Sequence, residues 1–177
     1  MLMKVTSSAV LLHDSAFDVT LDRAVGPAGR VIEKHVLKHP GAVVVLARNA
    51  AAEVLLIRQY RLPLRKAIWE LPAGKVDRNE PRLKTARREL AEETGYQARH
   101  WRKLLEFHPA PGFCDERMTA YLAQDLRAGE AKPEPYEVIR PRWFGWDEVL
   151  EMIRRGRIHD AKTIATVLFV ERFGQPA

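Results

Sequence analysis

The spacing of hydrophobic and polar positions changes along the chain, and each change predicts an element. Over residues 1–40, apolar residues alternate weakly with polar ones in three segments, at 5–12, 17–21 and 31–37, with a turn-like stretch at 26–29. Such alternation is typical of strands that bury one face. We therefore expect a small antiparallel β subdomain at 1–40.

Two denser apolar segments follow, at 42–47 and 54–57, and the stretch between them is polar. They predict a pair of core strands joined by a hairpin connection. Further strands are predicted at 104–108, 118–122 and 138–144. Pro141 confines the last of these to a sheet edge or a bulge, because proline has no N–H to donate to a neighbouring strand.

Helical spacing first occurs over 81–94, where three apolar residues share one face: Leu83, Ala86 and Leu90. Asn79 or Glu80 is placed to cap the start of this helix, and Gly95 suits the left-handed residue that ends it. Two helices are predicted to close the chain. One covers 146–153 and the other centres on 164–168. Gly156 ends the first, and Asp160 or Thr163 stands near the start of the second.

Strands interspersed with helices make this an α/β chain. Its 177 residues are the length of one ordinary domain with a small addition. We take 1–40 as the addition and 41–177 as the main domain. Hydrophobic residues make up 46% of the chain and charged residues 29%, which favours a folded core over disorder.

Charge and cysteine content narrow the class of protein. The net charge of +6 and pI near 9.7 favour acidic partners such as nucleic acid, anionic lipid or small phosphorylated molecules. The single cysteine, Cys114, excludes an intrachain disulfide and fits a reducing compartment, so we expect a cytoplasmic protein. No apolar run is long enough to span a membrane, and we expect no membrane partner.

Three glutamates crowd one side of the predicted helix at 81–94. At about 100° per residue, Glu89 and Glu93 lie about 40° apart, and Glu92 lies about 60° from Glu89 on the other side. Carboxylates this close need cations to stay ionised together, and oxygen ligands favour hard ions such as Mg²⁺ or Mn²⁺. Arg88 can pair with one of these carboxylates and orient it.

The alternative is a solvated acidic helix face paired with cations such as Arg82 and Lys84. The surrounding residues argue against it. Gly74 permits a tight turn before the helix and leaves room for a metal at the carbonyl of Ala73.

The residues from 74 to 96 follow one pattern: Gly74, Glu80, Arg88-Glu89-Leu90, Glu92-Glu93 and Gly95-Tyr96. This pattern resembles the Nudix box at every position, and the chain resembles the ADP-ribose pyrophosphatase branch of Nudix hydrolases most. Three further segments carry that resemblance, at 58–61 (RQYR), 69–74 (WELPAG) and 111–116 (PGFCDE).

The resemblance implies an α/β/α sandwich with a mixed sheet, and a small N-terminal antiparallel β subdomain that is exchanged between the subunits of a homodimer. It also implies hydrolysis of the diphosphate of ADP-ribose, or of a related ADP-sugar, to AMP and a sugar phosphate. The cofactor would be Mg²⁺ or Mn²⁺.

Site residues follow from the same resemblance. The implied metal ligands are the carbonyl of Ala73 with Glu89, Glu93 and Glu137, and Glu92 would assist them. The implied substrate-binding residues are Arg58, Arg61, Glu70, Gly112 and Glu116.

The general base stays open, because this chain has Lys132-Pro133-Glu134-Pro135-Tyr136-Glu137 where relatives carry an acidic run. Glu137 adjoins the apolar start of a strand and is expected to be better fixed than Glu134, which lies between two prolines. Glu116 is the reserve candidate.

Two other hypotheses compete with this one, and a third, of an inactive member of the family, is opposed by the sequence. One is a Nudix hydrolase for another nucleoside diphosphate derivative. The other, of a different class, is a basic nucleic-acid-binding module, suggested by the pI and by the stretch 99–103, where Trp101 stands among cations. No nucleic-acid-binding motif accompanies that stretch, so we expect no nucleic-acid partner. A silent, ligand-sensing Nudix fold is opposed by the intact Arg88 and glutamates.

Overall fold

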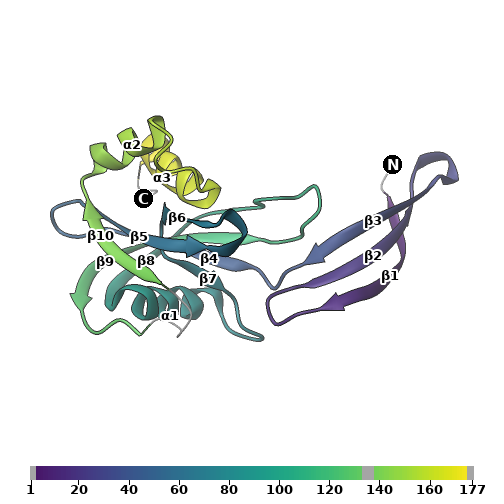
Figure 1. Cartoon of the computed structure of the whole chain (residues 1–177), viewed down its shortest axis with the longest axis horizontal. Coiled ribbons are helices and arrows are strands. Elements are labelled where there is room, and N and C mark those ends of the chain that lie inside the picture. Colours follow the sequence, from purple (N-terminus) through teal and green to yellow (C-terminus); the bar gives the residue numbers. More distant parts are fainter. Residues whose placement is uncertain (1–2, 133–137, 175–177) are drawn as a thin grey trace. The chain divides into compact units, whose positions relative to one another are not determined.

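The structure, a computed structural model, describes residues 3–132 and 138–174. The chain divides into two compact units, each of which is built from separate pieces of the sequence (Figure 1). The first unit comprises Met1–Gly41 and His108–Arg117, and the second comprises Ala42–Phe107 and Met118–Ala177.

The first unit is a three-stranded antiparallel sheet in the order β1-β2-β3. Its strands are β1 (Lys4–His13), β2 (Asp18–Val25) and β3 (Val31–Lys38). All three predicted strands are confirmed. The segment His108–Arg117 joins them through Leu37. The Leu37 N–H donates to the Phe113 carbonyl at 2.8 Å, and the Leu37 carbonyl accepts from the Asp115 N–H at 3.1 Å.

The second unit holds two sheets (Figure 1). The four-stranded sheet has the order β7 (Ala73–Lys75), β4 (Ala42–Ala47), β9 (Met118–Ala128) and β8 (Tyr96–Phe107). It is mixed, because β4 runs parallel to β9 and the other pairs are antiparallel. The three-stranded antiparallel sheet has the order β10 (Ile139–Phe144), β5 (Val54–Arg61) and β6 (Lys66–Glu70).

Helices cover these sheets on two sides: α1 (Arg82–Thr94) on one, and α2 (Trp146–Arg154) with α3 (Ala161–Phe173) on the other. The alternation of side chains along β4 explains the layers. Val43 and Val45 pack in the same core cluster as Leu90 of α1. Val44 packs in a second cluster with Val167 of α3. The predicted α/β/α sandwich with a mixed sheet is confirmed.

The hairpin predicted between 42–47 and 54–57 is wrong in its pairing. A bridge between Arg48 and Val54 closes the turn, but from there the strands enter different sheets. β4 is buried on both faces and pairs with β7 and with the distant β9. β5 is buried on both faces only over residues 54–57, and it pairs with the adjacent β6 and the distant β10. The short apolar segments do not reveal those partners. Pro141 lies in β10 at a sheet edge, as predicted.

The end of α1 agrees with the prediction from the sequence, but its start does not. Gly95 ends α1 with a φ of 77°, as predicted. No side chain caps the start of α1, where Pro81 is the cap residue, so the capping role expected of Asn79 or Glu80 is wrong. The Glu80 carboxylate accepts instead from Thr85, at 2.9 Å. Among the described helices, none is long and apolar enough to cross a membrane.

Candidate active site

Glu89 and Glu93 of α1 reach the backbone of β7. The Ala73 N–H donates to Glu93 Oε2 at 3.0 Å, and Glu93 is only 3% exposed. Gly74 lies against Glu89 so closely that an added Cβ would stand 1.9 Å from the Glu89 Cδ. The missing side chain at Gly74 therefore makes the niche in which the Glu89 carboxylate lies.

Arg88 gathers four carboxylates around one guanidinium group. Its Nη1 lies 2.8 Å from Glu89 Oε1 and 3.0 Å from Glu92 Oε2. Its Nη2 lies 3.1 Å from Glu80 Oε2 and 3.5 Å from Asp77 Oδ2. The hydrogen bond from Arg88 lowers the pKa of the Glu80 carboxyl below its usual value. Burial lowers the pKa of the Arg88 guanidinium, but the surrounding carboxylates outweigh burial and raise it. Arg88 thus contacts more carboxylates than the single one expected from the sequence.

The donors on α1 and β7 fit a hard divalent cation in their chemistry. They are the carboxylate oxygens of Glu89, beside Gly74, and of Glu93, beside the Ala73 N–H, together with the carbonyl of Ala73 that is expected as a ligand from the sequence. Within 3–132 and 138–174, no three His, Cys, Asp or Glu side chains form a metal-binding group. The physical reason is that Arg88 holds Glu89 and Glu92, whereas Glu93 lies against the Ala73 backbone. The expected ligand Glu137 and the expected base Glu134 lie outside the described residues.

Glu70 forms a buried ion-pair network behind this site. Its side chain is fully buried, and Arg61 makes a two-pronged contact with it at 2.8 and 2.7 Å. Lys162 of α3 contacts the same carboxylate and also Asp160, at 2.9 Å. Burial raises the pKa of the Glu70 carboxyl, but Arg61 and Lys162 outweigh burial and lower it. Glu70 is therefore ionised, and both its oxygens are occupied by protein cations.

The start of α3 also fixes the turn between β6 and β7. The Leu71 N–H donates to Thr163 Oγ1 at 2.9 Å, and Thr163 N–H donates to Asp160 at 3.0 Å. This turn leads directly to Ala73 and Gly74. Asp160 is predicted from the sequence to lie near the start of this helix, but the role of Lys162 is not, because its partner Glu70 lies 92 residues away and no local pattern joins them.

The other expected substrate-binding residues lie in both units. Arg58 is exposed on β5, opposite Trp69 of β6, and its guanidinium carbon lies 5.9 Å from the centre of that indole ring. Gly112 and Glu116 belong to the first unit. Within that unit, Gly112 is exposed and the Glu116 carboxylate lies 3.7 Å from Nδ1 of His39.

Comparison with known proteins agrees with this arrangement. The sequence matches the NUDIX domain model over residues 37–167. It is 32% identical over 170 residues to an ADP-ribose pyrophosphatase of Bacillus subtilis, covering 95% of this chain and 92% of the relative. It is 37% identical over 180 residues to an ADP-ribose pyrophosphatase of Mycobacterium tuberculosis, covering 97% and 86%. A crystal structure described as an ADP compounds hydrolase shares the fold, with a TM-score of 0.85 at 17% identity, covering 98% of this chain and 94% of the other. With its box residues gathered around Gly74 and Arg88, the chain belongs to the Nudix family.

Proposed function

We propose that the protein hydrolyses the diphosphate of ADP-ribose, or of a related ADP-sugar, to AMP and a sugar phosphate. The observation that carries the proposal is the contact of Glu89 and Glu93 with the backbone of Ala73 and Gly74. Two relatives named ADP-ribose pyrophosphatase, which align with nearly the whole chain, support the choice of substrate.

In this proposal, the carbonyl of Ala73 and the carboxylates of Glu89 and Glu93 would hold Mg²⁺ or Mn²⁺, and Glu92 would assist. A divalent ion held there would supply charge neutralisation at phosphoryl oxygens and a more acidic water molecule. Arg88 fixes the rotamers of Glu89 and Glu92 through its contacts with both carboxylates.

Substrate contacts are assigned to the cations of β5. Arg58 is suited to phosphate oxygens, because a guanidinium group donates two parallel hydrogen bonds. The Nε and Nη2 of Arg61 donate to Glu70, so Arg61 would contact the phosphate through Nη1. Glu70, whose oxygens are occupied by Arg61 and Lys162, serves to position Arg61 and does not touch the substrate. Glu137 remains the preferred general base ahead of Glu134, with Glu116 in reserve.

We also propose that the protein is a homodimer formed through the first unit. All ten residues of β1 are exposed, among them four large apolar ones at 51–62% exposure: Val5, Val10, Leu11 and Leu12. An exposed apolar patch of this kind is typical of a protein interface. The cytoplasm is the proposed location, since a protein with one cysteine gains nothing from an oxidising compartment.

A product assay tests the proposed reaction. The purified protein is incubated with ADP-ribose, an ADP-hexose, a GDP-hexose and a dinucleotide, first with Mg²⁺, then with Mn²⁺, and finally with a chelator. AMP release from ADP-ribose or the ADP-hexose, abolished by the chelator, is expected. Hydrolysis of the GDP-hexose alone would contradict the proposed substrate and would indicate a hydrolase for another nucleoside diphosphate derivative.

A further inference from the structure

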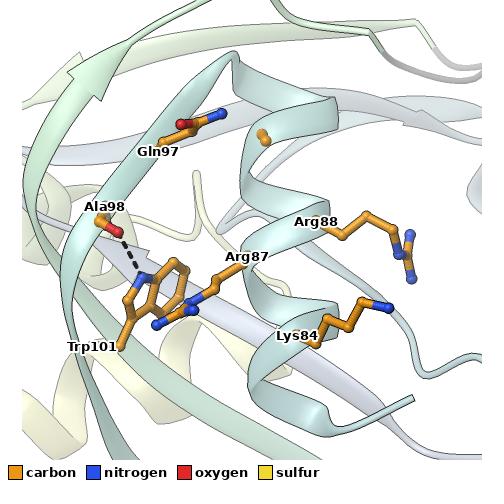
Figure 2. Close-up of a pocket in the computed structure, with 7 residues that line it drawn as sticks. Lys84, Arg87, Arg88, Gln97, Ala98 and Trp101 are labelled. Atoms are coloured by element: carbon orange, nitrogen blue, oxygen red, sulfur yellow. Dashed lines mark hydrogen bonds between the residues drawn. The ribbon is translucent and has the colours of Figure 1, made fainter. Parts of the chain in front are cut away.

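A groove of about 400 Å³ lies between α1 and β8 in the second unit. Figure 2 shows the side chains along it: Lys84, Arg87 and Arg88 from α1, and Gln97, Ala98 and Trp101 from β8. Its volume lies within the range of roughly 300–1,000 Å³ that is usual for small-molecule sites. The groove is large enough for a ligand of nucleotide size.

The groove opens on the flank of α1 that lies opposite Glu93. Lys84 and Glu93 are nine residues apart, which corresponds to about 900° of helical rotation, or half a turn beyond two full turns. Arg87 and Glu89 are likewise separated by about 200°. Arg88 borders both places, because it lines the groove and also contacts Glu89. Lys84 and Arg87, however, start from the flank of α1 turned away from Glu89 and Glu93, so a ligand held by these two cations is distinct from a substrate at those glutamates.

Two exposed cations, Lys84 and Arg87, line the groove. Neither forms an ion pair with a carboxylate that the structure describes, although Lys84 is near enough to Glu80 to help lower the pKa of the Glu80 carboxyl. They stand three residues apart on α1 and line the same groove, and Figure 2 shows Arg87 extending towards Trp101 while Lys84 extends towards the side of Arg88. An ammonium and a guanidinium group in this arrangement suit a phosphate monoester, which accepts several hydrogen bonds from both.

Trp101 supplies an oriented aromatic surface beside these cations. Its indole N–H donates to the Ala98 carbonyl at 2.9 Å, and its ring makes an edge contact with Tyr121 at 6.4 Å between ring centres. Because the only polar atom of the indole is already bonded, what the ring offers to the groove is apolar surface. Such a surface binds a nucleobase by stacking.

We propose that this α1–β8 groove is a second binding site, separate from the active site, for a nucleoside monophosphate. Lys84 and Arg87 bind the phosphate, and the base lies against Trp101. Gln97, which is exposed at the end of the groove, offers an amide to the polar edge of the base or to the ribose. The two cations and the aromatic ring of Trp101 together therefore suit one class of ligand, a nucleoside monophosphate.

Binding of AMP to the full-length protein in the presence of a chelator tests the proposal. The chelator removes divalent metal from the active site and so weakens the binding of a phosphate there. Titration calorimetry and tryptophan fluorescence are expected to show one AMP per chain. Lys84→Glu and Arg87→Glu are expected to weaken binding by about tenfold or more, the loss that follows removal of a hydrogen bond to a charged group. Trp101→Leu is expected to weaken binding and remove the fluorescence change.

Two control variants separate the groove from the rest of the molecule. Arg172→Glu makes the same charge change on exposed α3 and is expected to leave AMP affinity unchanged. Glu93→Gln, which disables the proposed hydrolysis, is also expected to bind AMP normally. Unchanged melting temperatures and circular dichroism of the variants exclude a folding defect, and Trp101→Phe retains an aromatic ring if Trp101→Leu fails to fold.

Several results would overturn the proposal. These are no AMP binding, normal binding in Arg87→Glu, or an equal loss in Arg172→Glu, which would indicate unspecific charge attraction. If inorganic phosphate bound as tightly as AMP, the nucleoside would contribute nothing to affinity, and the site would not be one for a nucleoside monophosphate. A single-stranded RNA oligomer that binds far more tightly than AMP, with a steep salt dependence, would make the groove a nucleic-acid site instead.

Discussion

Gly74 shows how one residue shapes the site, because the absence of its side chain makes the space that the Glu89 carboxylate occupies. Gly74→Ala would place a methyl group 1.9 Å from the Glu89 Cδ, and the flexible end of Glu89 has to move away. We expect turnover of ADP-ribose to fall by about 10- to 100-fold, as when the supports of a metal ligand are lost. The melting temperature should fall by only a few degrees, because a side chain moves and the backbone does not.

Gly145→Ala is the matched control for this substitution. A Cβ at Gly145 meets no atom within 4 Å, and its φ of −60° is suitable for alanine. Initial rates of ADP-ribose hydrolysis and thermal unfolding are measured for both variants, and Gly145→Ala is expected to match the wild type in both. Normal turnover in Gly74→Ala would mean that the position of Glu89 is irrelevant to the reaction.

At the scale of elements, the Glu70 network joins β5, β6 and the start of α3. Glu70→Gln leaves Arg61 and Lys162 without the buried charge that both contact. We expect the free energy of unfolding to fall by about 3 kcal/mol, the cost of breaking a buried ion pair. Urea unfolding at pH 7 measures this, with Glu148→Gln on the exposed face of α2 as the control that should change nothing.

The pH dependence of stability tests the same network. The folded-state pKa of Glu70 is lowered below the ordinary 4.5, so its contribution is complete above that value and is lost as the pH falls through the lower folded-state pKa. The difference in stability between wild type and Glu70→Gln should therefore shrink as the pH is lowered below 4.5. A difference that persists undiminished at low pH would assign the effect to packing.

Comparison of α1 with the Glu70 network shows what the sequence can predict. The sequence predicts the three glutamates of α1 and its end because they lie within one helix, where the rotation per residue is known. These residues are Glu89, Glu92, Glu93 and Gly95. The contact of Lys162 with Glu70 and the entry of β4 and β5 into different sheets depend on residues far apart in the chain. Such long-range pairings leave no periodicity in the local sequence. The hydrogen bond of Arg88 to Glu80 was missed for a different reason: Glu80 precedes the first residue of α1, so the helical rotation does not place it.

At the scale of the whole molecule, the exposed apolar face of β1 predicts a dimer. Val10→Glu combined with Leu12→Glu places two charges on that face and is expected to yield monomers, because buried unpaired charges destabilise an interface. Lys34→Glu, exposed on β3 of the same unit, should remain dimeric. Light scattering gives the mass of each variant. A wild-type monomer, or a fully dimeric double variant, would contradict the assignment.

The most direct test of the central claim, that Glu89 and Glu93 support metal-dependent hydrolysis, is the turnover of ADP-ribose by Glu93→Gln at saturating Mg²⁺. Glutamine keeps an oxygen to accept the Ala73 N–H, so folding is retained while the negative charge is lost. The account predicts at least a ~100-fold fall in turnover with an almost unchanged melting temperature. Turnover close to that of the wild type in a correctly folded Glu93→Gln would contradict it.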